Sequence, residues 1–367
     1  MHLEEGEKRA FLPEFIADLA DYGFVVYVED GYGGGMGFSN ADYLAAAPSI
    51  NFCDLDQVYQ QDIVLVLRYP GDDRVARMRF GACLISMLHY PTRPMRVKFL
   101  RERHLQAVSL DSIKDDVGRR LVENLRAVSW NGIEVAFNVL REHYPPPGFN
   151  DPNRLPIKVT VMGAGAVGTY AIQAAIRYGN QEVWHHMAKI GATGVQVTVV
   201  DYDVTNHPNI IQQILKYTDI LVDATQRVDT SKPVIPNEWI ALMRPHAVLL
   251  DLSVDPYVTE GGEVTATKGI EGIPQGNLDQ YVFFPDDPAY DSLPQGIRTE
   301  SRRYVVSCYS WPGIHPRECM DVYGKQISPI MHMIADKGGV DHIEPRGSFF
   351  ERAAARGILK FWINHSV

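Results

Sequence analysis

The stretch Val161-Met-Gly-Ala-Gly-Ala-Val-Gly-Thr-Tyr170 decides the fold of the second half of this chain. It follows a β-branched run that predicts a strand, and it opens the helical pattern Val167 to Tyr178. The first glycine permits a tight turn, the second lets the backbone approach a pyrophosphate, and the third lets helix and strand pack closely. The stretch predicts a dinucleotide-binding loop at a helix N-terminus, with cofactor contacts from Gly163, Ala164, Gly165, Ala166, Val167 and Gly168.

An acidic residue ends the next predicted strand. The run Val195 to Val200 leads into Asp201, a residue type that hydrogen-bonds a ribose 2′-hydroxyl and repels a 2′-phosphate. Asp201 comes later than the usual gap of about 20 residues after the third glycine. The segment Gln181 to Gly191 fills the extra length as an extended or second helix. The pattern therefore favours NAD over NADP as the cofactor.

Composition limits the class of protein. A chain of 367 residues is too long for one ordinary core, so two domains are expected. A formal charge of -10 and the lack of a Lys/Arg-rich block argue against a nucleic-acid partner. The first residues lack a signal-peptide pattern, and no window is apolar enough for a membrane span. We therefore expect a cytoplasmic protein without a membrane partner.

The residue types that bind metals are scattered. The 4 cysteines form no CxxC pair, which predicts reduced thiols rather than a disulfide framework or a zinc ribbon. His315 and Cys319 fall one helical turn apart, but no further ligands can be assigned to them. The sequence therefore predicts no metal site.

Short apolar runs alternate with helical patterns along most of the chain. This alternation predicts an α/β protein of parallel sheets with helices on both faces. The expected strands are Phe24 to Val28, Ile63 to Leu67, Ala82 to Leu88, Ala107 to Leu110, Lys158 to Met162, Val195 to Val200, Ile220 to Val222, Val248 to Leu252 and Tyr304 to Cys308. The expected helices are Pro13 to Tyr22, Val117 to Tyr144, Val167 to Tyr178 and Pro316 to Lys337, with a docked helix in the tail after Arg346.

Two segments are expected to be loops. A polar, proline-dense stretch between Tyr144 and Pro156 cannot continue a helix, and we place the connection between the two halves there. The glycine cluster Gly31 to Gly37 fails the spacing of a nucleotide loop. It predicts a flexible loop at the edge of a cleft.

Several segments together resemble the superfamily of alanine dehydrogenase, the NAD-binding subunit of proton-translocating transhydrogenase, and the lysine-forming saccharopine dehydrogenases. The similar segments are Glu7-Lys-Arg-Ala-Phe-Leu-Pro13, Asp62-Ile-Val-Leu-Val-Leu-Arg-Tyr-Pro70, Leu84-Ile-Ser-Met-Leu-His-Tyr-Pro91, the glycine loop and Val248-Leu-Leu-Asp-Leu-Ser-Val-Asp255. The short interval between Asp201 and Asp219 is more similar to the saccharopine branch.

The resemblance implies two Rossmann-like, doubly wound domains with the active site in the cleft between them. The substrate domain comes first and is discontinuous, with residues 1–126 and 311–367, and the NAD-binding domain covers residues 127–310. The implied activity is that of an NAD-dependent oxidoreductase acting on the C–N bond of an amino or imino acid, as in alanine dehydrogenase.

The resemblance also implies roles for individual residues. Arg9 is the expected anchor of the substrate carboxylate, with Lys8 as the alternative because the register is uncertain by one. His89 is the expected acid/base group. Asp255 follows a strand end, where it can orient a water or stabilise an iminium, and Asp251 is the competing carboxylate.

Arg68 departs from the family pattern, because the family carries a catalytic lysine there. An arginine can bind a carboxylate or polarise a carbonyl, but it cannot release a proton. This leaves two alternatives open: a saccharopine- or opine-type dehydrogenase with a larger secondary-amine substrate, and an NAD-binding protein without turnover. Arg119, Arg120 and Arg317 are candidates for a second carboxylate, although solvated charges are the favoured interpretation. A homo-oligomer is left open.

Overall fold

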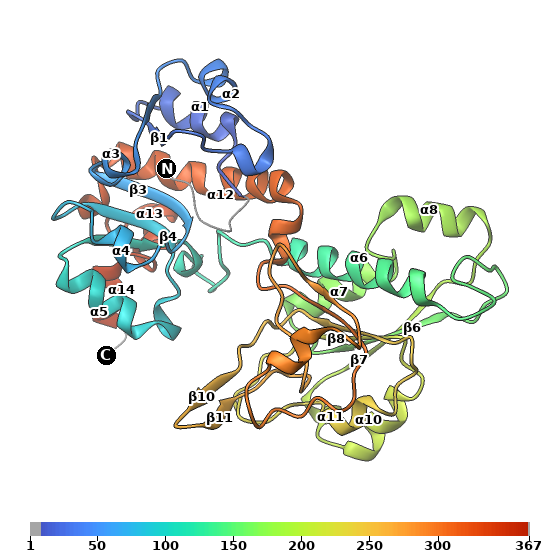
Figure 1. The fold of residues 1–367 in the computed structure, drawn as a ribbon. Helices are drawn as coiled ribbons and strands as arrows, with labels where there is room; N and C mark the ends of the chain where they lie inside the picture. The colour runs from blue at the N-terminus through green and yellow to red at the C-terminus, as the bar shows by residue number, and fades with distance from the viewer. Residues whose placement is uncertain (1–8, 366–367) are drawn as a thin grey trace. The chain divides into compact units, whose positions relative to one another are not determined.

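The chain divides into two compact units. The structure, a computed structural model, describes residues 9–365. The first unit contains the residues up to Asn124 and those from His315 onward, whereas the second runs from Leu125 to Ile314. Figure 1 shows the red C-terminal helices joined to the blue N-terminal part of the chain. The proline-dense stretch after Tyr144 therefore lies inside the second unit and does not connect the two, contrary to the expectation from sequence.

The first unit is built on a parallel sheet of three strands in the order β3-β4-β5 and a parallel pair β1-β2. Its strands are β1 (Tyr27–Glu29), β2 (Asn51–Cys53), β3 (Ile63–Arg68), β4 (Cys83–Met87) and β5 (Gln106–Ser109). Its α-helices are α1 (Pro13–Asp21), α2 (Asn40–Ala46), α3 (Leu55–Tyr59), α4 (Asp72–Val75), α5 (Pro94–Glu102), α12 (Pro316–Asp336), α13 (Phe349–Ala355) and α14 (Leu359–His365). Short 3₁₀ helices are η1 (Gly34–Met36), η2 (Tyr90–Thr92), η3 (Leu110–Ser112) and η6 (Val340–His342).

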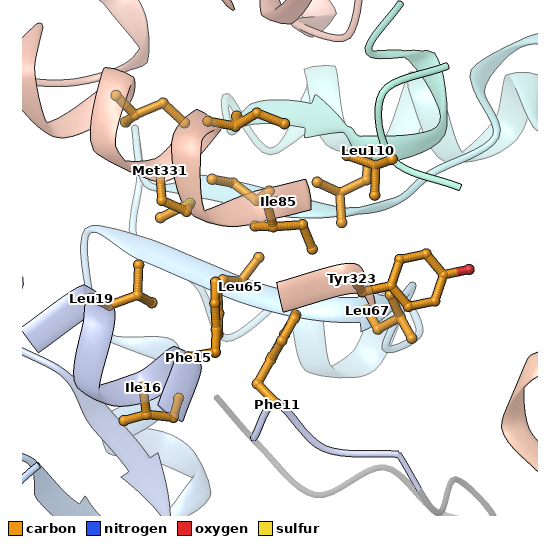
Figure 2. Close-up of a cluster of buried hydrophobic side chains, with 14 of the residues drawn as sticks. Phe11, Phe15, Ile16, Leu19, Leu65, Leu67, Ile85, Leu110, Tyr323 and Met331 are labelled. Carbon is orange, nitrogen blue, oxygen red and sulfur yellow. The ribbon is translucent and has the colours of Figure 1, made fainter. Parts of the chain in front are cut away.

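Both faces of the first sheet are covered, because successive side chains of a strand point to opposite faces. Leu65 and Ile85 pack with α1 and α12 on one face, whereas Val64 and Leu84 pack with α5 on the other. Figure 2 shows the first of these cores, where side chains of α1, β3, β4 and α12 point toward one another. The C-terminal helices thus complete a core that begins with the first described residues.

The second unit contains a six-stranded sheet in the order β12-β13-β9-β8-β6-β7 and a hairpin β10-β11. Its strands are β6 (Ile157–Met162), β7 (Val195–Val200), β8 (Ile220–Asp223), β9 (Val248–Asp251), β10 (Val258–Glu260), β11 (Glu263–Ala266), β12 (Val282–Phe283) and β13 (Tyr304–Ser307). Its helices are α6 (Leu125–His143), α7 (Ala166–Ala175), α8 (Gln181–Lys189), α9 (Tyr202–Thr205), α10 (Pro208–Leu215), α11 (Asn237–Ile240), η4 (Pro288–Ser292) and η5 (Trp311–Ile314).

The large sheet is doubly wound. All its pairings are parallel except that between β12 and β13. Val161 and Leu250 face a core with α6 and α7, whereas Met162 and Leu249 face a core with α10 and α11. The chain leaves β6 for β7 on one side and then continues to β8 on the other side, so the strand order reverses next to β6. Open sheets bind ligands outside the carboxyl ends of their strands at such a point.

The predicted fold class is confirmed, and one predicted helix boundary is wrong. The helix expected from Val117 begins at Leu125 instead. Asp115 accepts main-chain hydrogen bonds from Val117 (3.0 Å) and Arg119 (2.7 Å), and Gly118 has φ 84°. These local bonds form a turn that competes with the helix.

Within residues 9–365, no helix combines the length and apolar character needed to cross a bilayer.

We expect Ile85→Ala to destabilise the first unit by about 2–5 kcal/mol, because this fully buried side chain leaves a cavity in a core with little room to relax. Urea unfolding followed by circular dichroism would measure the loss. Val25→Ala is the control, since Val25 is 73% exposed. Equal effects of the two substitutions would contradict the assigned core.

Candidate functional site

The glycine loop follows β6 and leads into α7. Gly163 has φ 95°, and a Cβ there would lie 2.6 Å from the carbonyl oxygen of Ala224. A Cβ at Gly168 would lie 1.9 Å from the carbonyl oxygen of Gly163, so both positions require glycine. A Cβ at Gly165 would have no other atom within 4 Å. The loop is therefore tight on its protein side and open at the helix N-terminus, as a bound pyrophosphate requires.

Asp201 lies beside this loop at the carboxyl end of β7. One carboxylate oxygen accepts from the main-chain N–H of Ala164 (3.3 Å), and the other accepts from that of Tyr202 (2.8 Å). The side chain is exposed. The structure thus brings Asp201 to the glycine loop even though the two are far apart in sequence.

A buried polar cluster lies under the carboxyl ends of β8 and β9. Asp251 is fully buried and binds the ammonium group of Lys268 (2.7 Å) and the hydroxyl of Ser307 (3.0 Å). Burial alone would raise the pKa of Asp251, but the charge of Lys268 outweighs it and lowers that pKa. Asp251, the competing carboxylate of the sequence analysis, is therefore fully buried within the second unit.

Asp223 is the second carboxylate of this cluster. It is fully buried, and it accepts hydrogen bonds from Thr225 (2.7 Å) and from the hydroxyl of Ser253 (3.2 Å). Burial and the nearby charge of Asp251 raise its pKa to about 6. Sequence reasoning missed both Asp223 and Lys268. Asp223 could have been found because it directly follows a predicted strand, but no pattern marks Lys268.

Asp255 follows the cluster in a loop and remains partly exposed. One of its carboxylate oxygens binds Arg227 at 2.7 Å, and 28% of its side chain is accessible. Of the two carboxylates considered in the Val248–Asp255 segment, only Asp255 can therefore reach a ligand.

Three polar side chains follow the three strands of the first unit's parallel sheet. Arg68 ends β3 and pairs with Met87 of β4. His89 comes two residues after β4, and Asp111 comes two residues after β5. Because the carboxyl ends of parallel strands share one edge of the sheet, these residues lie at the same edge.

His89 is held by Asp111, a residue that the sequence analysis did not single out. Its Nδ1 lies 3.2 Å from one carboxylate oxygen of Asp111, and its main-chain N–H donates to the other at 3.1 Å. His89 also has φ 51°, which is rare for a residue other than glycine. Burial opposes ionisation of Asp111, but hydrogen bonds from His89 and Ser109 (2.7 Å) outweigh it and hold its pKa below the ordinary range. The histidine side chain itself is 51% exposed.

Two of the predicted carboxylate anchors, Arg9 and Arg317, lie at the first turn of α12. Arg9 is half-buried, with Nη1 4.0 Å from the sulfur of Cys319 in the first turn of that helix. Arg317 donates twice to the carbonyl oxygen of Met36 (2.7 and 3.1 Å), so it connects the glycine cluster Gly31 to Gly37 with α12. Arg119 pairs with Asp115 at the surface. Lys8 lies outside the described residues.

Among residues 9–365, no group of three or more metal-binding side chains is positioned to hold an ion.

Two family models match this chain. The model of the alanine dehydrogenase/PNT N-terminal domain matches residues 3–129, and that of the C-terminal domain matches residues 152–274. The chain belongs to the alanine dehydrogenase/PNT family. The superfamily suggested by the sequence is thereby confirmed, and membership supports an oxidoreductase of the alanine dehydrogenase kind.

Individual relatives of this family member are distant in sequence. It is 24% identical to alanine dehydrogenase of Bacillus subtilis, over 92% of this chain and 85% of that protein. It is 21% identical to NAD(P) transhydrogenase subunit alpha of Haemophilus influenzae, over 97% of this chain and 68% of that protein. A solved L-alanine dehydrogenase has a TM-score of 0.72 at 17% identity, covering 98% of this chain and 94% of the other. A transhydrogenase structure from Sinorhizobium meliloti has a TM-score of 0.62 at 18% identity, covering 91% and 92%.

The raised pKa of Asp223 gives this family member a testable pH dependence. The folded protein binds this proton more tightly than the unfolded chain, so the stabilisation is complete below the ordinary pKa of 3.8 and is lost as the pH rises through about 6. We compare the free energy of unfolding of Asp223→Asn with that of the wild type. As the pH rises from about 4 to 8, we expect this difference to increase in favour of the variant by on the order of 3 kcal/mol.

Denaturant unfolding at several pH values would measure this gain. The control is Asp286→Asn, which removes an exposed carboxylate from the same unit. A difference between Asp223→Asn and wild type that does not change with pH would contradict the assigned burial effect.

Proposed function

We propose that this protein is an NAD-dependent oxidoreductase acting on the C–N bond of an amino or imino acid. The proposal assigns acid/base and carboxylate-binding groups to the first unit. It assigns the cofactor loop and Asp255 to the second unit.

The two contacts between Asp111 and His89, one with the ring and one with the main chain, are the observation that carries the proposal. A carboxylate beside Nδ1 favours the tautomer that has its proton on Nδ1, which leaves Nε2 to accept a proton. The second carboxylate oxygen of Asp111 holds the main chain of His89 in an uncommon conformation. Such strain persists where the surroundings impose it, and it is found most often at functional positions.

The reaction requires the protein to bind the substrate carboxylate, to transfer protons, and to orient a water or stabilise the iminium. Oxidation of an amino acid removes a hydride from Cα and a proton from the amine; water then adds to the imine, and ammonia leaves. Nicotinamide supplies the hydride acceptor when the cofactor is bound. Arg9 and Arg68 would hold the substrate carboxylate, and His89 would move the protons. Asp255 would orient the water or stabilise the iminium charge.

The residues of the second unit fit a dinucleotide. The open side of Gly165 at the N-terminus of α7 suits a pyrophosphate, and Asp201 suits a ribose with a free 2′-hydroxyl. Asp201 is also exposed, so that a ribose can reach it. These features support NAD rather than NADP.

A saccharopine- or opine-type dehydrogenase is the second candidate. It is favoured by a cavity of about 430 Å³ in the first unit, which can accept a second carboxylate arm. Asp116 already pairs with two arginines of this cavity (2.6 and 2.8 Å), so a substrate carboxylate would compete with it or bind Lys114. The lining includes Pro91, Ser112, Lys114, Arg352, Arg356, Phe361 and Trp362.

Absorbance of NADH would test the proposal. Purified protein with NAD is challenged at alkaline pH with a panel of L-amino acids, saccharopine and opines. Reduction of NAD by an L-amino acid would support the alanine dehydrogenase-like reaction, and reduction by saccharopine or an opine would support the second candidate. No reduction across the panel, with NAD binding verified by calorimetry, would contradict both and favour a binding protein without turnover.

We expect His89→Asn to lower kcat by roughly 10²–10⁴-fold, because it removes the acid/base group while keeping a similar shape. Asp111→Asn should lower kcat as well, by a smaller factor, because the ring loses the carboxylate that orients it. Steady-state kinetics with the substrate found in the panel would measure both.

Asp56→Asn is the matched control, since it removes a surface carboxylate that pairs with Arg77 in the same unit. The variants should bind NAD as the wild type does. Full activity of His89→Asn would refute the assigned role.

We expect Asp201→Ser to weaken the preference for NAD over NADP by about tenfold or more, because the charge that repels a 2′-phosphate is gone. Calorimetric affinities for both nucleotides would measure the change independently of turnover. Asp203→Ser removes an equal charge two residues away and should leave the preference as it is. Similar shifts in the two variants would point to a general charge effect.

A further inference from the structure

Arg227 is a buried arginine in the loop that follows β8, and the reaction outlined above gives it no role. Only 7% of its side chain is exposed. One terminal nitrogen donates to the carbonyl oxygen of Lys232 at 2.7 Å, and the other donates to that of Thr267 at 2.5 Å. The second nitrogen also binds a carboxylate oxygen of Asp255 at 2.7 Å. One side chain thus joins the β8 loop, the Asp255 loop and the segment after β11.

We infer that Arg227 is a positioning residue that aims the free carboxylate oxygen of Asp255 at the cationic nitrogen of the substrate. The inference rests on the proposed function, which assigns Asp255 to the iminium or the water. Arg227 occupies Oδ2 of Asp255, whereas Oδ1 makes no hydrogen bond with any residue that the structure describes. A carboxylate fixed through one oxygen presents the other in a defined direction.

The main chain of Asp255 is also fixed. Lys268 donates to its carbonyl oxygen at 2.9 Å while it binds Asp251 at 2.7 Å. The preceding residue, Val254, has φ 58°, and its N–H donates to Asp251 at 2.8 Å. A β-branched residue rarely adopts this conformation, so the turn is imposed by its surroundings. With main chain and carboxylate both held, Asp255 has little freedom to reorient.

Two buried polar atoms at this place have no partner in the described structure. They are Nε of Arg227 and the hydroxyl oxygen of Thr267, whose side chain is almost fully buried. Buried donors and acceptors are nearly always satisfied by protein, water or ligand. Nε belongs to the guanidinium group that binds Asp255, so a polar group of a ligand, or an ordered water, would complete its hydrogen bonding.

Kinetics of Arg227→Met would test the inference. A misplacement of about 1 Å at a reacting centre costs on the order of a hundredfold in rate, so we expect kcat to fall between about ten- and a hundredfold. The KM for NAD should change less than twofold. Arg227→Lys should recover part of the loss, and Arg227→Met in an Asp255→Asn background should cost nothing further, because the two residues act as one unit.

Arg244→Met is the matched control. Arg244 binds the buried Asp219 at 2.9 Å in the same unit, so its loss removes a similar ion pair elsewhere. A wild-type kcat in Arg227→Met, or equal losses of kcat in both arginine variants, would overturn the inference. Arg227 would then have only a structural role.

A second measurement separates this inference from the proposed function. Carboxyl ¹³C resonances of labelled aspartates report on Asp255 without turnover, and Asp255→Asn identifies its signal. We expect Arg227→Met to shift that signal, with no effect from Arg244→Met. If the protein oxidises no compound of the panel but these shifts occur, the proposed function fails and the positioning of Asp255 stands. An unchanged Asp255 signal in Arg227→Met overturns the positioning, whatever the activity.

Discussion

Parallel strand pairing is the constraint on which both groups of candidate residues depend. Strands that run in the same direction end at the same edge of a sheet, so a polar residue after each strand joins the residues after its neighbours. In the first unit this gathers Arg68, His89 and Asp111. In the second it gathers the glycine loop, Asp201 and the Asp223–Asp251 cluster. Residues far apart in sequence thereby meet without any local motif.

The buried charges of the second unit have a cost that the fold must offset. A carboxylate out of water is unfavourable unless it is paired or neutral. Asp251 is paired with Lys268, whereas Asp223 is driven toward its neutral form by burial and by the charge of Asp251. The same ammonium group also holds the loop that carries Asp255. The ammonium group that offsets the cost of burying Asp251 therefore also holds the Asp255 loop in place.

Sequence reasoning succeeded where a pattern has one structural meaning. The strands β3 to β9 and β13 could be predicted because β-branched runs bounded by turn residues are typical of strands, and the glycine loop because its spacing requires close packing. The short strands β2, β10, β11 and β12 were not predicted. It failed at Val117, where side-chain bonds of Asp115 and a left-handed glycine replace a helical turn. Asp111 was within reach, since it directly follows a predicted strand. Arg227 and Lys268 were not, because their partners lie in other loops and no periodicity joins them.

In the proposed function, Arg68 changes which residue carries the proton chemistry. The resemblance implies a lysine at this position, and a lysine can both hold a carboxylate and release a proton when it is buried. An arginine can do only the first. In the proposed function, proton transfer in the first unit would then fall on His89, so the contact of Asp111 with the ring would matter more than it would beside a lysine. In the proposed function, carboxylate binding and proton transfer would therefore belong to different side chains: an arginine of fixed charge, and a histidine whose ring and main chain both contact Asp111.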